Sequence, residues 1–146
     1  MASIKIRQRF KTSLQETFNA VTDHQMLSRN LPFLTIEVVK HPQGAPNGLG
    51  SIRAMGSPLF RPLKEKVVAM DAPNRQEYTI VGVMKHAITH HYGILEFKAD
   101  GDGTVVDWHI ELVAKPAFMS KLLLGVIGQG IRQGLSREAK KLGNGR

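Results

Sequence analysis

The last part of the chain, residues 118–142, carries the pattern that most restricts the fold. It predicts a long amphipathic helix that begins after the helix-breaking pair Lys115 and Pro116. Apolar residues recur there at three- and four-residue steps and predict one buried stripe, made of Met119, Leu122, Leu123, Val126, Ile127, Ile131, Leu135 and Leu142. Glycines interrupt the helix, each at a cost of about 1 kcal/mol relative to alanine, at Gly125, Gly128, Gly130 and Gly134. Two explanations remain open: the glycines let the helix approach a sheet closely, or they leave space that a ligand fills.

Composition limits the chain to one compact domain. With 146 residues, of which 42% are hydrophobic and 22% charged, residues 1–146 are expected to form a single domain with a substantial core. The absence of cysteine excludes disulfides and thiolate metal sites. The longest apolar run, residues 122–127, is far shorter than the roughly 20 residues that span a bilayer, and the first residues do not resemble a secretory signal. We therefore expect a cytoplasmic protein without a membrane span.

The net charge of +8 would suit an acidic partner. The basic residues are spread over the whole chain, however, and aromatic residues make up only 6% of it, so nucleic-acid binding is disfavoured. Docking of an acidic macromolecule through Lys5, Arg7, Arg9 and the C-terminal basic cluster remains an alternative function.

The rest of the chain reads as one strand, two short helices and a series of strands. Residues 4–10 alternate between apolar and basic side chains, as in a strand with one buried face. Ser13 and Glu16 form a capping box for a helix that ends near Val21. Asp23 can cap a second helix, which ends at Asn30. Six further strands are expected over residues 34–40, 50–55, 63–70, 75–83, 86–98 and 104–114. The expected fold class is α+β, with an antiparallel sheet and a long C-terminal helix.

Hairpin geometry predicts which side chains share a face of the sheet. A turn at Gly101 and Asp102 sets four opposite pairs: Phe97 with Val106, Leu95 with Trp108, Gly93 with Ile110, and His91 with Leu112. The earlier turns set five more: Thr89 with Ile80, His91 with Tyr78, Tyr78 with Val67, Ile80 with Glu65, and Glu65 with Arg53. The inward face therefore combines apolar side chains with five polar ones, Arg53, Glu65, Tyr78, Thr89 and His91.

This mixture predicts a small-molecule site. Ionisable groups in a dry core must be paired, so Arg53 and Glu65 either form a structural ion pair or face a space filled by water or ligand. Apolar walls with a few converging polar groups are typical of binding pockets. We expect access beside the loop at residues 56–62, where Leu59 and Phe60 are apolar.

Five short motifs, taken in order, carry a resemblance to a known superfamily. They are residues 48–53 (GLGSIR), 63–68 (LKEKVV), 71–75 (DAPNR), 92–93 (YG) and 103–108 (GTVVDW). With the order of elements, they resemble the START-like (SRPBCC) superfamily and are most similar to its bacterial polyketide cyclase/dehydrase and lipid-transport family. The resemblance implies the helix-grip fold, in which a seven-stranded antiparallel sheet wraps around a long C-terminal helix and two short helices follow the first strand. The resemblance covers essentially the whole chain. It implies binding of a lipid, sterol, quinone or polyketide, or an enzyme that cyclises or dehydrates polyketides, without assigning catalytic residues.

The expected function is binding of a hydrophobic or amphipathic small molecule between the sheet and the C-terminal helix. The candidate ligand-binding residues are Arg53, Glu65, Tyr78, Ile80, Thr89, His91, Leu95, Phe97, Trp108, Ile110, Ile127, Gly130 and Ile131. If the protein is a cyclase- or dehydratase-like enzyme, its candidate catalytic residues are Glu65, Tyr78, His91 and Arg53. No cofactor is expected, and no metal site, since the neighbouring histidines His90 and His91 point to opposite faces of a strand.

Overall fold

A computed structural model describes residues 2–40, 42, 48–57, 60–81 and 88–144, without the side chains of residues 57, 60–62, 89 and 144. The elements follow one another as β1 (Ala2–Phe10), α1 (Leu14–Thr22), α2 (Met26–Asn30), β2 (Thr35–Lys40), β3 (Ile52–Ser57), β4 (Phe60–Asp71), β5 (Arg75–Val81), β6 (Ile88–Asp100), β7 (Gly103–Ala114) and α3 (Phe118–Asn144). The strands form one seven-stranded sheet in the order β1-β7-β6-β5-β4-β3-β2.

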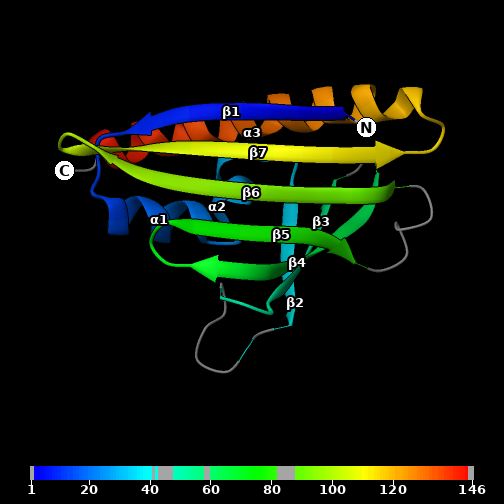
Figure 1. Cartoon of the computed structure of the whole chain (residues 1–146), viewed down its shortest axis with the longest axis horizontal. Coiled ribbons are helices and arrows are strands. Elements are labelled where there is room, and N and C mark those ends of the chain that lie inside the picture. The colour runs from blue at the N-terminus through cyan, green and yellow to red at the C-terminus, as the bar shows by residue number, and fades with distance from the viewer. Residues whose placement is uncertain (1, 41, 43–47, 58–59, 82–87, 145–146) are drawn as a thin grey trace.

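The sheet curls around the helices. Figure 1 shows β1, β7 and β6 running alongside α3, whereas β2 at the other edge crosses their direction. Neighbouring strands are antiparallel throughout the sheet. The helix α3 packs on β1 and β7 and meets α2 near its C-terminal end. The predicted α+β helix-grip arrangement is therefore confirmed.

Short sequence patterns determine the orientation of β1 and the starts of the first two helices. In β1 the residues at every second position face inward, and Ile6 and Phe10 are buried. The hydroxyl of Ser13 accepts the backbone N–H of Glu16 at 3.2 Å, so the predicted cap of α1 is confirmed. The helix α2 begins later than predicted, because Asp23 accepts from the backbone N–H of Gln25 at 3.0 Å in the turn that precedes the helix.

The register of the sheet agrees with the predicted pairing except between β5 and β6. The four predicted pairs of β6 with β7 are present, as are the pairs Arg53 with Glu65, Glu65 with Ile80, and Val67 with Tyr78. Tyr78, however, lies opposite Gly93 and not opposite His91. The β5–β6 register is thus shifted by two residues from the prediction, which moves His91 along the same face. The turn assumed at 84–85 lies outside the described residues.

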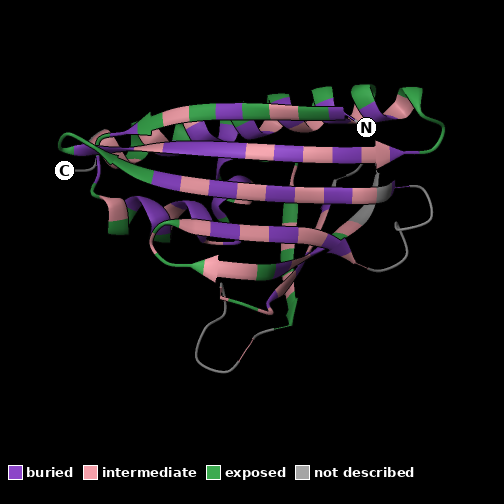
Figure 2. Ribbon diagram, viewed as in Figure 1, coloured by how far each residue is buried: buried purple, intermediate pink, exposed green. Residues whose placement is uncertain are grey.

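The buried stripe of α3 differs from the predicted one. The side chains of Leu124, Ile131 and Leu135 are almost fully buried, whereas Leu122 and Val126 are 57% and 54% exposed. The inclusion of Leu122 and Val126 in the buried stripe was wrong, because the first half of α3 contacts the sheet along the line that runs through Leu124. Figure 2 shows buried and exposed residues alternating along this helix.

The glycines of α3 divide between the two explanations. A Cβ atom at Gly128 would lie 2.5 Å from Cδ1 of Ile4 on β1, and one at Gly134 would lie 2.6 Å from Cδ2 of Leu27 on α2. These two glycines allow close packing. At Gly125 a Cβ would meet no atom within 4 Å, and at Gly130 the nearest atom would be at the ordinary contact distance of 3.8 Å. The second pair therefore leaves space.

A buried carboxylate fastens the C-terminal half of α3 to α2. Glu138, whose side chain is only 4% exposed, accepts from Nη2 of Arg29 at 2.8 Å and from Nδ2 of Asn30 at 3.0 Å. Arg137 donates to the backbone carbonyl of Asn30 at 2.6 Å. Hydrogen bonds to a charged group contribute about 1.5–3 kcal/mol each when buried, so this junction holds the end of the helix in place.

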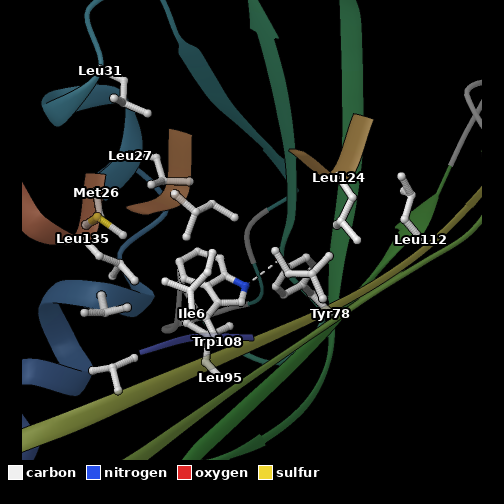
Figure 3. Close-up of a cluster of buried hydrophobic side chains, with 14 of the residues drawn as sticks. Ile6, Met26, Leu27, Leu31, Tyr78, Leu95, Trp108, Leu112, Leu124 and Leu135 are labelled. Atoms are coloured by element: carbon white, nitrogen blue, oxygen red, sulfur yellow. Dashed lines mark hydrogen bonds between the residues drawn. The ribbon is translucent and has the colours of Figure 1, made fainter. Parts of the chain in front are cut away.

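The apolar core fills the space between α3, the short helices and the β1 side of the sheet. Figure 3 shows Met26, Leu27 and Leu135 gathered at one end of this cluster. Ile6, Leu95 and Leu112 come from the sheet and are almost fully buried. This core is packed under β1, β7 and β6, and beside it residues of β3, β4 and β5, with a few of β6 and β7, line a cavity.

Candidate functional site

A cavity of about 920 Å³ lies between α3, the α2 region and the inner face of strands β3 to β7. Its walls are mainly apolar and include Leu31, Met55, Leu63, Ile88, Leu123 and Ile127. Gly130 of α3 also lines it, and so does Gly125, which is exposed. Small-molecule pockets in proteins typically measure about 300–1,000 Å³, and this cavity falls within that range.

The polar part of the wall is built on the pairing of β3 with β4. Arg53 and Glu65 lie directly opposite each other in the sheet, and their side chains are 9% and 3% exposed. Nε of Arg53 donates to Oε1 of Glu65 at 3.0 Å, and an Nη atom lies at the same distance from that oxygen. Burial alone would raise the pKa of Glu65, but the charge of Arg53 and the contact with His91 outweigh burial and lower the pKa to about 2. Glu65 is therefore a carboxylate at neutral pH.

His91 of β6 contacts the other oxygen of this carboxylate. Its Nε2 lies 2.8 Å from Oε2 of Glu65, and the imidazole is 2% exposed. The N–H direction departs from the line to the oxygen, so the contact is a close electrostatic one and not a well-aligned hydrogen bond. Its Nδ1 is buried and has no hydrogen-bond partner among the described residues. His91 is thus held by Glu65 on one side only.

A second histidine lies behind Arg53. Nη1 of Arg53 lies 3.2 Å from Nδ1 of His24, and Nε2 of His24 lies 2.8 Å from the hydroxyl of Ser51. Arginine is only a donor, so Nδ1 of His24 is the acceptor and Nε2 carries the proton. Ser51 in turn donates to the backbone carbonyl of Gly48 at 2.7 Å. The chain of hydrogen bonds that begins at Arg53 therefore ends on the backbone.

Tyr78 of β5 covers the guanidinium of Arg53. Cζ of Arg53 lies 4.8 Å from the centroid of the Tyr78 ring, a cation–π distance. The indole N–H of Trp108 donates to the Tyr78 hydroxyl at 2.9 Å, as the dashed line in Figure 3 shows. Burial, reinforced by the nearby charge of Glu65, raises the pKa of Tyr78 strongly, so this phenol keeps its proton.

Gly93 provides the space for the Tyr78 ring. The two residues are opposite each other on β5 and β6, and a Cβ atom at Gly93 would overlap Cζ, Cε1 and the hydroxyl oxygen of Tyr78. Any other residue at this position would displace the ring. The glycine therefore determines where Tyr78 lies in the wall of the cavity.

The cavity is open to solvent along the first half of α3. The exposed residues that line it are Phe33, between α2 and β2, and Lys115, Lys121, Leu122, Gly125, Val126, Gln129 and Gln133. They locate the mouth between α3 and the α2–β2 connection. The access predicted beside the loop at 56–62 involves side chains outside those that the structure describes.

The structure brings most of the candidate ligand-binding residues to one cavity. Those that line it are Arg53, Glu65, Tyr78, His91, Trp108, Ile127, Gly130 and Ile131. Ile80, Leu95, Phe97 and Ile110 are buried in the core and do not line it. The side chain of Thr89 lies outside the described part of the structure.

Sequence reasoning missed both His24 and the apolar mouth. His24 lies in the turn between α1 and α2, where no periodicity identifies an inward-facing residue. The only available signal was that Arg53 has more donors than Glu65 can accept. The role of Leu122 and Val126 was hidden because their spacing equally suits a buried stripe. Among the described residues, no group of acidic or histidine side chains is arranged to hold a metal ion, and no helix is long and apolar enough to cross a membrane.

Known proteins share this fold. Residues 1–143 match the family described as polyketide cyclase/dehydrase and lipid transport. Solved structures that resemble the chain include truncated norcoclaurine synthase from Thalictrum flavum (TM-score 0.73, 18% identity, covering 99% of this chain and 94% of that one). The protein XoxI from Bacillus cereus aligns with a TM-score of 0.75 at 13% identity, covering 99% and 97% of the two chains. Ara h 8.0201 aligns with a TM-score of 0.71 at 16% identity, covering 98% and 99%.

These identities are low, so the solved structures establish the fold and nothing about the ligand. A search of curated proteins found no match. The match to the family, by contrast, covers nearly the whole chain and agrees with the order of motifs in the sequence. The chain therefore belongs to the polyketide cyclase/dehydrase and lipid transport family and has the helix-grip fold of the START-like superfamily.

Proposed function

We propose that the protein reversibly binds a neutral, amphipathic small molecule, with its apolar body in the cavity and its polar end near Tyr78 and His91. The observation that carries this proposal is the cavity of about 920 Å³ with an apolar wall and one buried polar cluster. The family contains proteins of lipid transport, which agrees with such a ligand.

The charge of the polar cluster favours a neutral ligand. Arg53 is neutralised by Glu65 and directs a further donor to His24, so it offers no free cation to a carboxylate. Glu65 stays ionised and would repel an anion brought close to it. Tyr78 keeps its proton and can donate a hydrogen bond, while Nδ1 of His91 has no partner among the described residues. A hydroxyl group, which both donates and accepts, complements these two residues.

The proposal is tested by titration with matched probes. A long-chain alcohol and the carboxylate of the same chain length are added to the purified protein, and binding is followed by the emission of Trp108, the single tryptophan. We expect the alcohol to bind more tightly. At 100 times its Kd it would stabilise the fold by about 2.7 kcal/mol, which raises Tm by about 5 to 10 °C for a chain of this size.

Gly130→Phe is the blocking variant, because it introduces a ring into the cavity from α3. Val68→Phe is its control, since Val68 is 40% exposed and does not line the cavity. Equal binding of the alcohol by both variants would contradict the location. Absence of binding by the unaltered protein to either probe, with no molecule retained through purification in native mass spectrometry, would contradict the function.

A second candidate function is catalysis of proton transfer, as in a cyclase or dehydratase. It is favoured by the contact of Nε2 of His91 with the ionised Glu65 at 2.8 Å, an arrangement that orients an imidazole as a general base. Tyr78 would donate a hydrogen bond to the developing enolate. Turnover of a polyketone probe that is lost in His91→Gln, with Tm unchanged, would establish this candidate, and retention of turnover would exclude it.

A further inference from the structure

The mouth of the cavity is surrounded by exposed apolar side chains. Phe33, Leu122 and Val126 line the cavity and are 55%, 57% and 54% exposed, and Phe118, one helical turn before Leu122, is 71% exposed. We call these four residues the apolar rim. They make up four of the seven large hydrophobic side chains that are exposed among the described residues, so the exposure is concentrated at one place.

The side chains of the apolar rim lie on the two sides of the opening of the cavity. Phe118, Leu122 and Val126 follow one another at four-residue steps and therefore share one side of α3. Figure 2 shows exposed positions along the outer side of the first turns of this helix. Phe33 faces the same opening from the α2–β2 connection, because it lines the same cavity. The two sides of the opening are thus both apolar.

The surroundings of the rim are basic. Residues 112–137 include Lys115, Lys121, Arg132 and Arg137 and contain no aspartate or glutamate. Lys115 and Lys121 are exposed and also line the cavity, and within the described part of the chain no carboxylate forms an ion pair with either of them. An apolar ridge bordered by unpaired cations matches the interface of an anionic bilayer, where lipid headgroups are negative and the layer beneath them is apolar.

We propose that this rim docks on the surface of an anionic lipid bilayer, with the apolar side chains inserted among the headgroups and the lysines on the phosphates. The cavity would then open toward the phase in which a hydrophobic ligand is dissolved, a consequence that rests on the proposed function. A second copy of the chain fits the rim less well, because a symmetric contact would bring Lys115 and Lys121 of both copies together. An acidic protein would satisfy the lysines but leaves the continuity of the rim with the cavity unexplained.

The test is flotation of the full chain with vesicles of phosphatidylcholine alone or mixed with phosphatidylglycerol. We expect binding to the mixed vesicles and little to phosphatidylcholine. Lys121→Ala removes one cation near the surface and should weaken binding about fivefold. The double variant Phe118→Ser and Leu122→Ser keeps the net charge and should weaken binding about tenfold or more.

Matched controls separate docking at the rim from general attraction by the net charge. Lys98→Ala removes an exposed cation on β6, and Val68→Ser removes an exposed apolar side chain on β4; neither residue lines the cavity. Both controls should bind as the unaltered protein does. An equal loss of vesicle binding in Lys98→Ala and Lys121→Ala would overturn the proposal in favour of non-specific attraction. Unchanged vesicle binding by the serine double variant would overturn it as well.

The remaining outcomes also decide the matter. A dimer in light scattering that the serine double variant abolishes, together with no vesicle binding, would assign the rim to a second copy and overturn the proposal. Absence of vesicle binding in a protein that still binds the alcohol probe would refute docking and leave the proposed function standing. Vesicle binding in a protein that binds no probe would support docking and refute the proposed function.

Discussion

Replacement of Glu65 by glutamine removes the negative charge of a buried pair and leaves Arg53 without its counter-ion. The two side chains are 3% and 9% exposed, so water solvates the guanidinium too little to compensate for the lost charge. Removal of one partner from a buried ion pair typically costs about 3–5 kcal/mol. Since domains of this kind are stable by only about 5–15 kcal/mol, the variant should unfold at a markedly lower urea concentration.

The same residue makes stability depend on pH. The pKa of Glu65 falls from its ordinary 4.5 to about 2 in the folded protein, which corresponds to about 3 kcal/mol. A lowered pKa of a carboxyl group stabilises the fold above pH 4.5, and this contribution is lost as the pH falls from 4.5 toward 2. The unaltered protein should therefore lose stability in this window. In the glutamine variant this contribution to the pH dependence of stability should be missing, because glutamine does not titrate.

The assay is urea unfolding at pH 7, 4.5 and 3, followed by the emission of Trp108 and by far-UV circular dichroism. Glu37→Gln is the control, because Glu37 is an exposed glutamate on β2, the edge strand of the sheet. The double variant Arg53→Met and Glu65→Leu should recover much of the lost stability, since an apolar pair of similar volume carries no unpaired charge. A loss below about 1 kcal/mol in Glu65→Gln, with the pH dependence of the unaltered protein, would refute the account of a buried pair.

Three further substitutions test the packing. Gly93→Ala should destabilise the fold by about 2 kcal/mol or more and shift the near-UV signal of Tyr78, because the new Cβ overlaps its ring; an unchanged Tm would contradict this contact. Gly125→Ala should stabilise the fold by about 1 kcal/mol in urea unfolding, since no atom lies within 4 Å of the new Cβ, and a loss of stability would show hidden crowding. Glu138→Gln should lower the free energy of unfolding by about 2 kcal/mol, because Arg29 and Asn30 lose a charged acceptor. Amide hydrogen exchange in the last turns of α3 should become faster. Unchanged exchange would show that Glu138 does not hold this end of the helix.

The sequence was sufficient where short turns fix the register. The β6–β7 hairpin turns at Gly101, which has a φ of 60°, and the predicted pairs around Trp108 are present. The pairing of Arg53 with Glu65 followed in the same way from the strand pattern. Between β5 and β6 no comparable turn signal occurs in the sequence. A two-residue shift keeps every side chain on its face, so the alternating pattern could not detect it.

The sequence was insufficient where one pattern suits two environments. In α3, Leu122 and Leu124 are both leucines within one turn, yet one is 57% exposed and the other 2%. Periodicity shows that a helix has an apolar side, but it does not show which part of that side meets a sheet and which borders an opening. The same limit applies to His91, whose contact with Glu65 depends on a register that only the structure gives.

Because the Tyr78 ring fits over Gly93, the effect of a substitution at one of these two positions depends on the residue at the other. A smaller residue at 78 would create a void, and a larger residue at 93 could fill it from the opposite strand, so paired exchanges offer a way to reshape the cavity without rebuilding the sheet. Libraries that vary both positions together would therefore sample cavity shapes that changes at either position alone do not reach.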